Sequence, residues 1–318
     1  MDQSKDIFGL NSKCSIDFHE VLRFPNEKRV VARRRWAILA KALKSPTESQ
    51  PSSPTDEFSV RRISSFMLLK TQELTSLPLV SRDNKKHDQI KKYTWYKYSI
   101  CINGSEYFIN VGHRNRTFSA EDLMGFNNTG NICIWPSEET LSYFVCSNLE
   151  IFKEKNVIEL GGGMSCLAGL FAAKYGHAKS VLVTDGNKVS IDNVQVTLKC
   201  NTFLSEVGCS ILQWSSCEPV DQYDVVLCAD CLFFDDARTD LINCIWCCLA
   251  SDGTAYVMAP QRGSTLDMFI KQSEEKGFTC KKRLSYNDVV WEKRLALLDN
   301  CDFDDNIHYP ILIEVTKK

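Results

Sequence analysis

Three consecutive glycines at the end of an apolar run constrain the fold of this chain more than any other feature. The run is residues 156–163, NVIELGGG, and a helix-compatible stretch, MSCLAGLFAAKYG, follows it. A second apolar run, residues 181–186 (VLVTDG), then ends on an acid, Asp185. Strand, glycine turn, helix, strand and acid form the first unit of a doubly wound α/β sheet. In such a unit the glycines let the backbone approach a nucleoside, and the acid accepts the ribose hydroxyls.

The details of the turn indicate which adenosine-containing cofactor fits it. The nicotinamide and flavin fingerprint would place its third glycine at Cys166, and no G-K-[ST] follows for a P-loop. A pyrophosphate favours a turn rich in basic or hydroxyl groups, whereas this turn offers only Ser165. Glu159, just before the glycines, would repel a phosphate and suit a sulfonium or an ammonium. The pattern therefore favours S-adenosylmethionine; the alternative is an ordinary βα unit with a flexible turn.

Composition and charge restrict the setting in which the chain works. Its 318 residues include 15 cysteines but no apolar run long enough to span a membrane and no apolar segment typical of a signal peptide. We therefore expect a reducing compartment, the cytoplasm and also the nucleus, and no membrane partner. Residues 1–92 hold 18 Lys and Arg against 11 Asp and Glu, a net charge of +7, and the remainder has a net charge of −9. This split suits an acidic partner and a cationic substrate, or is solvated surface charge without a partner.

The N-terminal part of the chain differs in pattern from the rest. Residues 1–57 contain a basic amphipathic helix near 33–44 (RRRWAILAKALK) and a Pro/Ser-rich linker, and we expect them to be partly disordered. Residues 58–126 predict a β extension with a hairpin that turns at Asn103 and Gly104.

Residues 127–318 alternate between strand and helix patterns. Strands are expected at 156–160, 180–185, 208–213, 223–229, 254–259, 278–285 and 307–316, and helices near 137–151, 164–175, 188–200, 235–250 and 264–276. This alternation predicts a doubly wound, seven-stranded, mostly parallel α/β sheet with helices on both faces.

Ligands of such sheets bind outside the carboxyl ends of the strands, where the strand order reverses. If the order reverses between the first and fourth strands, the glycine turn faces Ala229 and Asp230 across one crevice. Asp185 and Trp214 end the two neighbouring strands. We expect Trp214 to pack on the adenine; a core position for this ring is the alternative.

Four cysteines have a spacing that superficially resembles a zinc site. Cys228, Cys231, Cys244 and Cys247 give C-x₂-C-x₁₂-C-x₂-C. The segment between them has the pattern of a buried strand and an amphipathic helix, and Cys244 and Cys247 lie one helical turn apart. We therefore predict core cysteines and no metal site.

Several strings together give the chain a resemblance to a known family. They are NTGNICIWPSEE (residues 128–139), ELGGGMSCLAGL, LVTDGN, LQWSS, YDVVLCADCLFFD and HYPILIEVTK. The chain resembles the seven-strand protein-lysine methyltransferases of methyltransferase-like family sixteen over residues 30–318, most densely over 127–263. The resemblance implies a Rossmann-like class I methyltransferase domain at 127–318 that uses S-adenosylmethionine. It further implies calmodulin as the protein substrate, a monomer, and no nucleic-acid partner.

The same resemblance implies which residues form the site. S-adenosylmethionine would be held by Trp135, Gly161, Gly163, Asp185, Trp214 and the backbone of Ala229, to which we add Glu159 for the cationic tail. The family motif D-x-x-[FY], associated with the lysine site, falls on Asp230 and Phe233. Most relatives carry Tyr at its last position, so Phe233 lacks the phenolic hydrogen bond and leaves an aromatic wall suited to cation–π contact. Asp230 would position the lysine rather than deprotonate it, because a carboxylate raises the pKa of a nearby lysine.

Three other functions fit the pattern less well. A methyltransferase for another protein lysine uses the same site residues. A degenerate fold that only binds a partner is opposed by the intact glycines, Asp185 and Asp230. A nucleic-acid methyltransferase of the N/D-P-P-[YF] type is opposed by the matching segment, which reads Ala-Asp-Cys-Leu-Phe.

Overall fold

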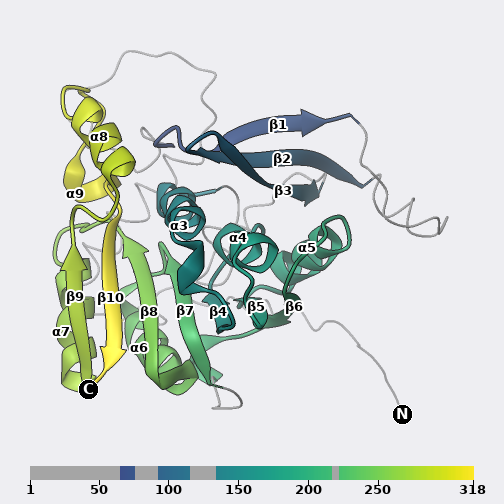
Figure 1. The fold of residues 1–318 in the computed structure, drawn as a ribbon. Coiled ribbons are helices and arrows are strands. Elements are labelled where there is room, and N and C mark those ends of the chain that lie inside the picture. The colour runs from purple at the N-terminus through teal and green to yellow at the C-terminus, as the bar shows by residue number, and fades with distance from the viewer. Residues whose placement is uncertain (1–64, 76–91, 115–133, 217–221) are drawn as a thin grey trace, which may run out of the picture. The chain divides into compact units, whose positions relative to one another are not determined.

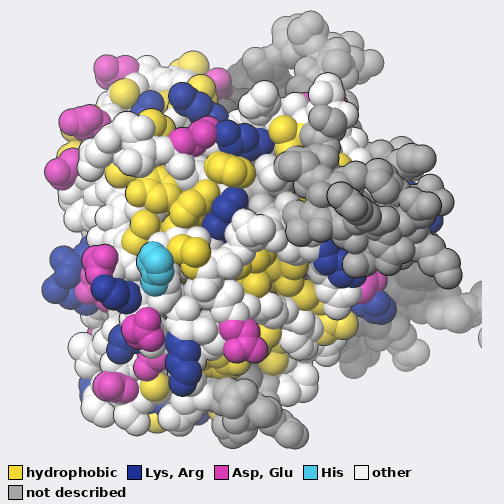
Figure 2. All heavy atoms as spheres, turned by 45° about the vertical axis from the view of Figure 1, so that its right-hand side comes forward, with side chains coloured by type: hydrophobic (Ala, Val, Ile, Leu, Met, Phe, Trp, Pro, Cys, Tyr) yellow, Lys and Arg dark blue, Asp and Glu magenta, His cyan; other side chains and the backbone are white. Residues whose placement is uncertain are grey.

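The computed structural model describes residues 65–75, 92–114, 134–216 and 222–318 of the chain. The basic helix predicted near residues 33–44 and the Pro/Ser-rich linker lie outside these ranges, as does most of the basic part of the predicted charge split. Within the described ranges, no helix is both long and apolar enough to cross a membrane. On the face shown in Figure 2, acidic and basic side chains are interspersed around hydrophobic ones, so this face carries no field of a single sign.

Seven strands form the central sheet. They are β4 (Asn156–Leu160), β5 (Ser180–Asp185), β6 (Glu206–Ile211), β7 (Tyr223–Ala229), β8 (Leu249–Ala259), β9 (Phe278–Arg283) and β10 (Ile311–Lys317). Their order is β6-β5-β4-β7-β8-β10-β9, and only β10 runs antiparallel to its two neighbours (Figure 1). This confirms the predicted seven-stranded, mostly parallel sheet. The strand order reverses between β4 and β7, which puts the predicted crevice at the carboxyl ends of these two strands.

Helices cover both faces of the sheet. Five of them are α3 (Pro136–Ser147), α4 (Leu167–Tyr175), α5 (Lys188–Leu198), α6 (Arg238–Cys248) and α7 (Thr265–Lys276). The helices α3, α4 and α5 lie on one face, and α6 and α7 lie on the other (Figure 1). Short 3₁₀ turns follow or precede them: η2 (Leu149–Ile151), η3 (Trp214–Ser216) and η4 (Asp235–Ala237).

The C-terminal part differs from the sequence prediction in two places. Helix α8 (Asp288–Leu297) was not predicted. The last strand begins at Ile311 rather than at residue 307, because a short helix, α9 (Asp305–His308), precedes it. Asp304 starts this helix, since its carboxylate accepts the backbone N–H of Asn306.

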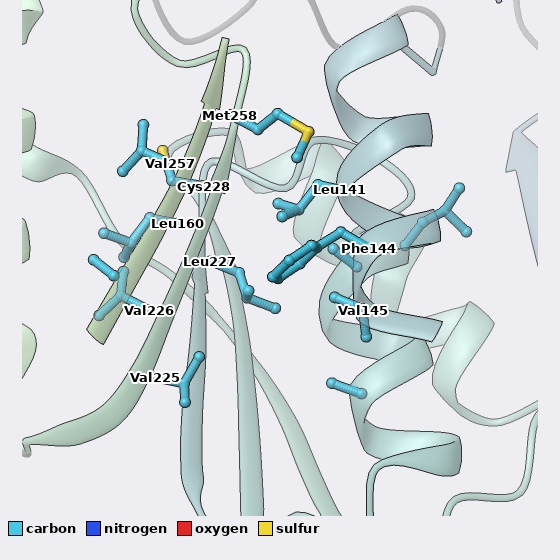
Figure 3. Close-up of a cluster of buried hydrophobic side chains, with 14 of the residues drawn as sticks. Leu141, Phe144, Val145, Leu160, Val225, Val226, Leu227, Cys228, Val257 and Met258 are labelled. Carbon is cyan, nitrogen blue, oxygen red and sulfur yellow. The ribbon is translucent and has the colours of Figure 1, made fainter. Parts of the chain in front are cut away.

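One part of the buried core lies between α3 and the middle of the sheet. Figure 3 shows Leu141, Phe144 and Val145 of α3 pointing toward the strands that carry Leu227 and Met258. The consecutive residues 225–228 of β7 are all buried. A strand covered by helices on both faces has no polar side to present to water, which explains its uninterrupted apolar run.

A three-stranded antiparallel sheet precedes the parallel sheet in sequence. Its strands are β1 (Lys70–Leu74), β2 (Tyr93–Ile102) and β3 (Ser105–Arg114), in the order β1-β2-β3. Asn103 and Gly104 join β2 to β3 with φ angles of 50° and 81°. Positive φ at both central residues is what a two-residue type I′ turn requires, so the predicted hairpin and its turn are confirmed.

Two asparagines that follow the glycine turn in sequence form hydrogen bonds with backbone groups on the outer edge of β3. The side chain of Asn201 accepts the N–H of Asn110 at 3.0 Å and donates to its carbonyl at 2.7 Å. Asn193 of α5 donates to the carbonyl of Gly112 at 2.8 Å. The edge strand therefore has hydrogen-bond partners from outside its own sheet, which leaves fewer backbone groups open to another chain.

One carboxylate in the first turn of α3 holds the segment that leads into β1. Glu139 is 2% exposed, and it accepts the Ser65 hydroxyl at 2.9 Å. It also accepts the backbone N–H groups of Phe66 (2.8 Å), Leu68 (2.7 Å) and Leu69 (3.0 Å). These four donors converge on a single buried group, so the antiparallel sheet is tied to α3 through Glu139.

We predict that Glu139→Gln lowers the free energy of unfolding by about 3 kcal/mol. The amide keeps the shape of the carboxylate but replaces an acceptor oxygen with an N–H₂ group that faces donors, and an unsatisfied buried donor costs roughly 1–3 kcal/mol. Urea denaturation measures the loss, and hydrogen exchange at Phe66 and Leu68 should speed up. The matched control is Glu150→Gln at an exposed position; equal stability of the two variants would contradict the anchoring role.

Candidate functional site

The glycine turn between β4 and α4 lies at the point where the strand order reverses. Gly161 and Gly163 have φ angles of 67° and 63°. A Cβ on Gly161 would lie 2.7 Å from the Cys231 sulfur and 2.9 Å from a ring carbon of Trp214. Residue 161 therefore has to be glycine both for its backbone conformation and for the close approach of its neighbours.

Asp185 stands at the end of β5 and orders this turn. It is 6% exposed, and its two carboxylate oxygens accept the backbone N–H groups of Gly163 (3.0 Å) and Asn187 (2.8 Å). Gly162 is fixed to the same strand, because its N–H donates to the carbonyl of Thr184 at 3.0 Å. Each carboxylate oxygen can accept more than one hydrogen bond, so Asp185 retains acceptor capacity for a ribose.

Two buried acids bind the N-terminus of α4. The Glu159 carboxylate accepts the N–H of Gly169 at 2.9 Å. The Glu138 carboxylate accepts the N–H of Leu167 at 3.3 Å and the Ser165 hydroxyl at 2.5 Å. In a phosphate-binding turn, the N–H groups at this helix end would instead donate to the phosphate. The helix end is satisfied internally, and this agrees with the sequence argument against a pyrophosphate cofactor.

Both acids titrate far above their usual range. Burial, together with the nearby Glu138 and Asp185 carboxylates, raises the pKa of Glu159 to about 8. Burial also raises the pKa of Glu138 to about 7. Glu159 is 1% exposed, and its second oxygen has no hydrogen-bond partner among the described residues. Its main contact is internal, which the sequence did not reveal, and a direct contact with a cofactor stays a prediction.

The two predicted tryptophans approach the turn in different ways. Trp214, at the start of η3, is half-buried and packs with its ring against Gly161 and the core. Trp135 lies at the N-terminus of α3, and its backbone hydrogen-bonds to Glu138. The structure thus places Trp214 directly at the glycine turn, whereas Trp135 is linked to the segment after the turn through the Glu138 carboxylate.

Ala229, Asp230 and Phe233 follow one another at the end of β7. Ala229 pairs with Met258 on β8 and is the last residue of its strand. Asp230 then turns into the left-handed region with a φ of 55°, and its N–H donates to the Met258 carbonyl at 2.8 Å. This turn lies next to the glycine turn in space, because the thiol of Cys231 donates to the carbonyl of Leu160 at 3.5 Å.

Arg262 is a site residue that the sequence analysis missed. Its guanidinium donates to both oxygens of Asp230, at 2.5 and 3.0 Å, and lies 5.5 Å from the centre of the Phe233 ring. The side chains of Arg262 and Asp230 are only 15% and 8% exposed. Arg262 follows the end of β8, the neighbour of β7. The available sequence signal was therefore a basic residue shortly after the end of one strand and an acid directly after the end of the neighbouring strand.

The four cysteines with zinc-like spacing have other contacts. Cys228 is buried in β7, Cys231 donates to backbone carbonyls, and Cys244 and Cys247 lie on α6. Among the described residues, no group of three or more His, Cys, Asp or Glu side chains is placed to hold a metal ion.

Comparisons with known proteins give a consistent set of relatives. A family model described as lysine methyltransferase matches residues 119–276. The chain is 30% identical over 304 residues to the calmodulin-lysine N-methyltransferase of Arabidopsis thaliana, which covers 89% of this chain and 96% of that protein. It is 26% identical over 117 residues to the human electron transfer flavoprotein beta subunit lysine methyltransferase, covering 35% and 43%. A TehB-like SAM-dependent methyltransferase from Corynebacterium glutamicum matches with a TM-score of 0.42 and 19% identity, over 56% of this chain and 87% of that one.

We predict that Glu159→Gln weakens the pH dependence of stability. The folded-state pKa of Glu159, about 8, lies above the ordinary value of 4.5, so the folded state binds more protons between these pH values. The free energy of unfolding should therefore fall as the pH rises from 5 to 8, and the variant should fall less. At pH 8 the variant should be more stable than the wild type by about 1 kcal/mol or more.

Urea denaturation at a series of pH values, without cofactor, measures this difference. Glu138 contributes a slope of the same sign, so the variant flattens the curve only in part. The control is Glu292→Gln on the exposed side of α8. Parallel curves for wild type and Glu159→Gln would mean that Glu159 is ionised in the fold.

Proposed function

The chain belongs to the lysine methyltransferase family, and on this basis we propose that it transfers methyl groups from S-adenosyl-L-methionine to a lysine of calmodulin. The observation that carries the choice of calmodulin is the reach of the likeness to the Arabidopsis protein. That likeness extends over 304 residues and 96% of the relative, well beyond the region that the family model matches. The net charge of +7 over residues 1–92 also suits calmodulin, which is strongly acidic.

The residues present fit S-adenosylmethionine. A cradle formed by Gly161 and Trp214 leaves no room for a Cβ and offers an aromatic face for adenine. Asp185 has acceptor capacity for the ribose, and the α4 N-terminus is already bound by carboxylates, so no pyrophosphate is needed. Burial raises the pKa values of Glu138 and Glu159, because a buried carboxylate is poorly solvated. A sulfonium and an ammonium nearby would favour their ionised forms.

The protein has little covalent chemistry to perform. When bound, S-adenosylmethionine supplies a methyl group on a sulfonium, which is a strong methyl donor. The chain must hold a neutral lysine nitrogen in line with that methyl group and exclude water. Asp230 and Phe233, at the end of the strand next to the glycine turn, are the residues we assign to the lysine side. Proton loss from the lysine, whose unperturbed pKa is ~10.4, goes to water before alignment.

We predict that Asp185→Ala lowers the affinity for S-adenosylmethionine at least tenfold. The substitution removes charge-assisted hydrogen bonds to the ribose, each worth roughly 1.5–3 kcal/mol, and releases the N–H of Gly163. Isothermal titration measures the affinity, and a melting curve shows whether the variant is folded. Asp192→Ala removes a surface carboxylate that pairs with Lys188 on α5 and should leave affinity unchanged. Wild-type affinity in folded Asp185→Ala would mean that another group holds the ribose.

We expect unmodified calmodulin to gain methyl groups on a lysine when it is incubated with the enzyme and S-adenosylmethionine. Intact-mass and peptide mass spectrometry identify the modified residue, and Asp185→Ala serves as the enzyme with weakened cofactor binding. If the enzyme methylates another protein in a lysate but not calmodulin, the substrate assignment is wrong and the assignment as a lysine methyltransferase stands. Tight cofactor binding with no protein methylated at all would instead favour a binding module.

A further inference from the structure

On the proposed lysine side of the site, one arginine of the protein occupies a position that could bind a cation. We call this position, formed by Asp230 and Phe233, the cation seat. A carboxylate beside an aromatic ring is an arrangement that attracts cations. Here the Asp230 carboxylate and the Phe233 ring hold the guanidinium of Arg262, at 2.5 and 3.0 Å from the two oxygens and 5.5 Å from the ring centre. An incoming ammonium therefore meets an acid whose charge is already matched.

The backbone holds Arg262 in this position. Its φ angle of 43° is in the left-handed region, which a side chain of this size rarely adopts. Its N–H donates to the carbonyl of Asn306 at 2.6 Å, and the N–H of the next residue, Gly263, donates to the Asn306 side chain at 3.0 Å. Strain of this kind persists only where neighbouring contacts fix it. The pair differs from exposed pairs such as Lys188–Asp192, whose side chains are 72% and 46% exposed.

The ion pair between Arg262 and Asp230 affects whether the target lysine is protonated. An unpaired carboxylate stabilises the ammonium and raises the pKa of the lysine, whereas only the neutral amine can attack a methyl group. A guanidinium beside that carboxylate cancels its field and adds a positive one. We propose that Arg262 is a positioning residue of the lysine site, which holds Asp230 and compensates its charge so that the target lysine enters as the neutral amine. This inference rests on the proposed function.

The step that it serves is a direct transfer. The lone pair of the lysine nitrogen forms a bond to the methyl carbon, and the carbon–sulfur bond breaks with its electron pair remaining on sulfur. The positive charge passes from sulfur to the methylated nitrogen, which then loses a proton to water. Arg262 takes no proton and forms no bond in this sequence.

The nearest thiol stays neutral, and nearby charged groups have ion-pair partners of their own. A hydrogen bond with the Cys228 side chain, burial, and the nearby Asp230 and Asp185 keep the pKa of the Cys231 thiol well above its usual value, so it stays neutral. The Asp305 carboxylate of α9 pairs with Arg294 of α8. On the side of α7 and β9, Asp267 pairs with Lys282.

The pH profile of methylation under single-turnover conditions tests the proposal. In Arg262→Gln the midpoint of the rate should move up by about one pH unit, which makes the rate at pH 7 about tenfold lower. The two rates should converge only at pH values above both midpoints. Arg262→Lys keeps a charge and should keep a midpoint close to that of the wild type.

Two further variants separate charge from structure. Asp230→Asn combined with Arg262→Gln removes both charges and should return the midpoint toward the wild-type value. Arg283→Gln breaks a similar two-bond pair, with Glu314 between β9 and β10, and should leave the midpoint unchanged. A loss in Arg262→Gln by the same factor at every pH, or a shift that persists in the double variant, would overturn the proposal.

A binding measurement tests the seat without catalysis. The probe is n-butylammonium chloride, which carries the end of a lysine side chain, titrated with saturating S-adenosylhomocysteine present. It should bind Arg262→Gln at least tenfold more tightly than the wild type, because the seat is vacated. Equal binding to the two proteins would refute the occupied seat. If the wild type methylates no protein, the proposed function fails, and this titration still decides the role of Arg262.

Discussion

The hydrogen bonding of the first turn of α4 is the interaction on which the site depends. Glu159 reaches it from β4 and Glu138 from α3, so the strand, the turn and two helices are joined through two carboxylates. Because these groups satisfy the helix end, the glycine turn is shaped without a ligand phosphate. The cost is that two acids are buried with raised pKa values. A cofactor with a cationic reactive centre would favour the ionised forms of these two acids, so the turn suits such a cofactor.

The acids on the two sides of the proposed site differ in how their charge is balanced. On the proposed cofactor side, burial raises the pKa values of Glu138 and Glu159 and favours their protonated forms. On the proposed lysine side, Asp230 pairs with Arg262 at short distance. An acidic cofactor side favours binding of the sulfonium, and a neutralised lysine side favours the neutral amine, which is the form that can accept the methyl group.

Much of the fold was predictable because its central strands are covered on both faces. The bounds of β4, β5 and β7 follow from mainly apolar runs that end beside a glycine or an acid. Helix α8 was missed because only Val290 among its residues is buried, so its apolar pattern is weak. Asp185, Gly161 and Trp214 were predictable from their places at strand ends. Arg262 and Glu138 were not, because their contacts join residues 32 and 27 positions apart in loops and caps without a local pattern.

The asparagine contacts along β3 have a consequence for the order of folding. The hairpin of β2 and β3 is local, and its turn residues favour early formation. Its outer edge is completed by Asn201 and Asn193, which lie 91 and 81 residues further along the chain than their partners. During synthesis from the N-terminus, the hairpin emerges well before these side chains do. The interval in which β3 has an open edge is therefore set by the ribosome, and it is then that the nascent chain is most exposed to strand pairing with a neighbour.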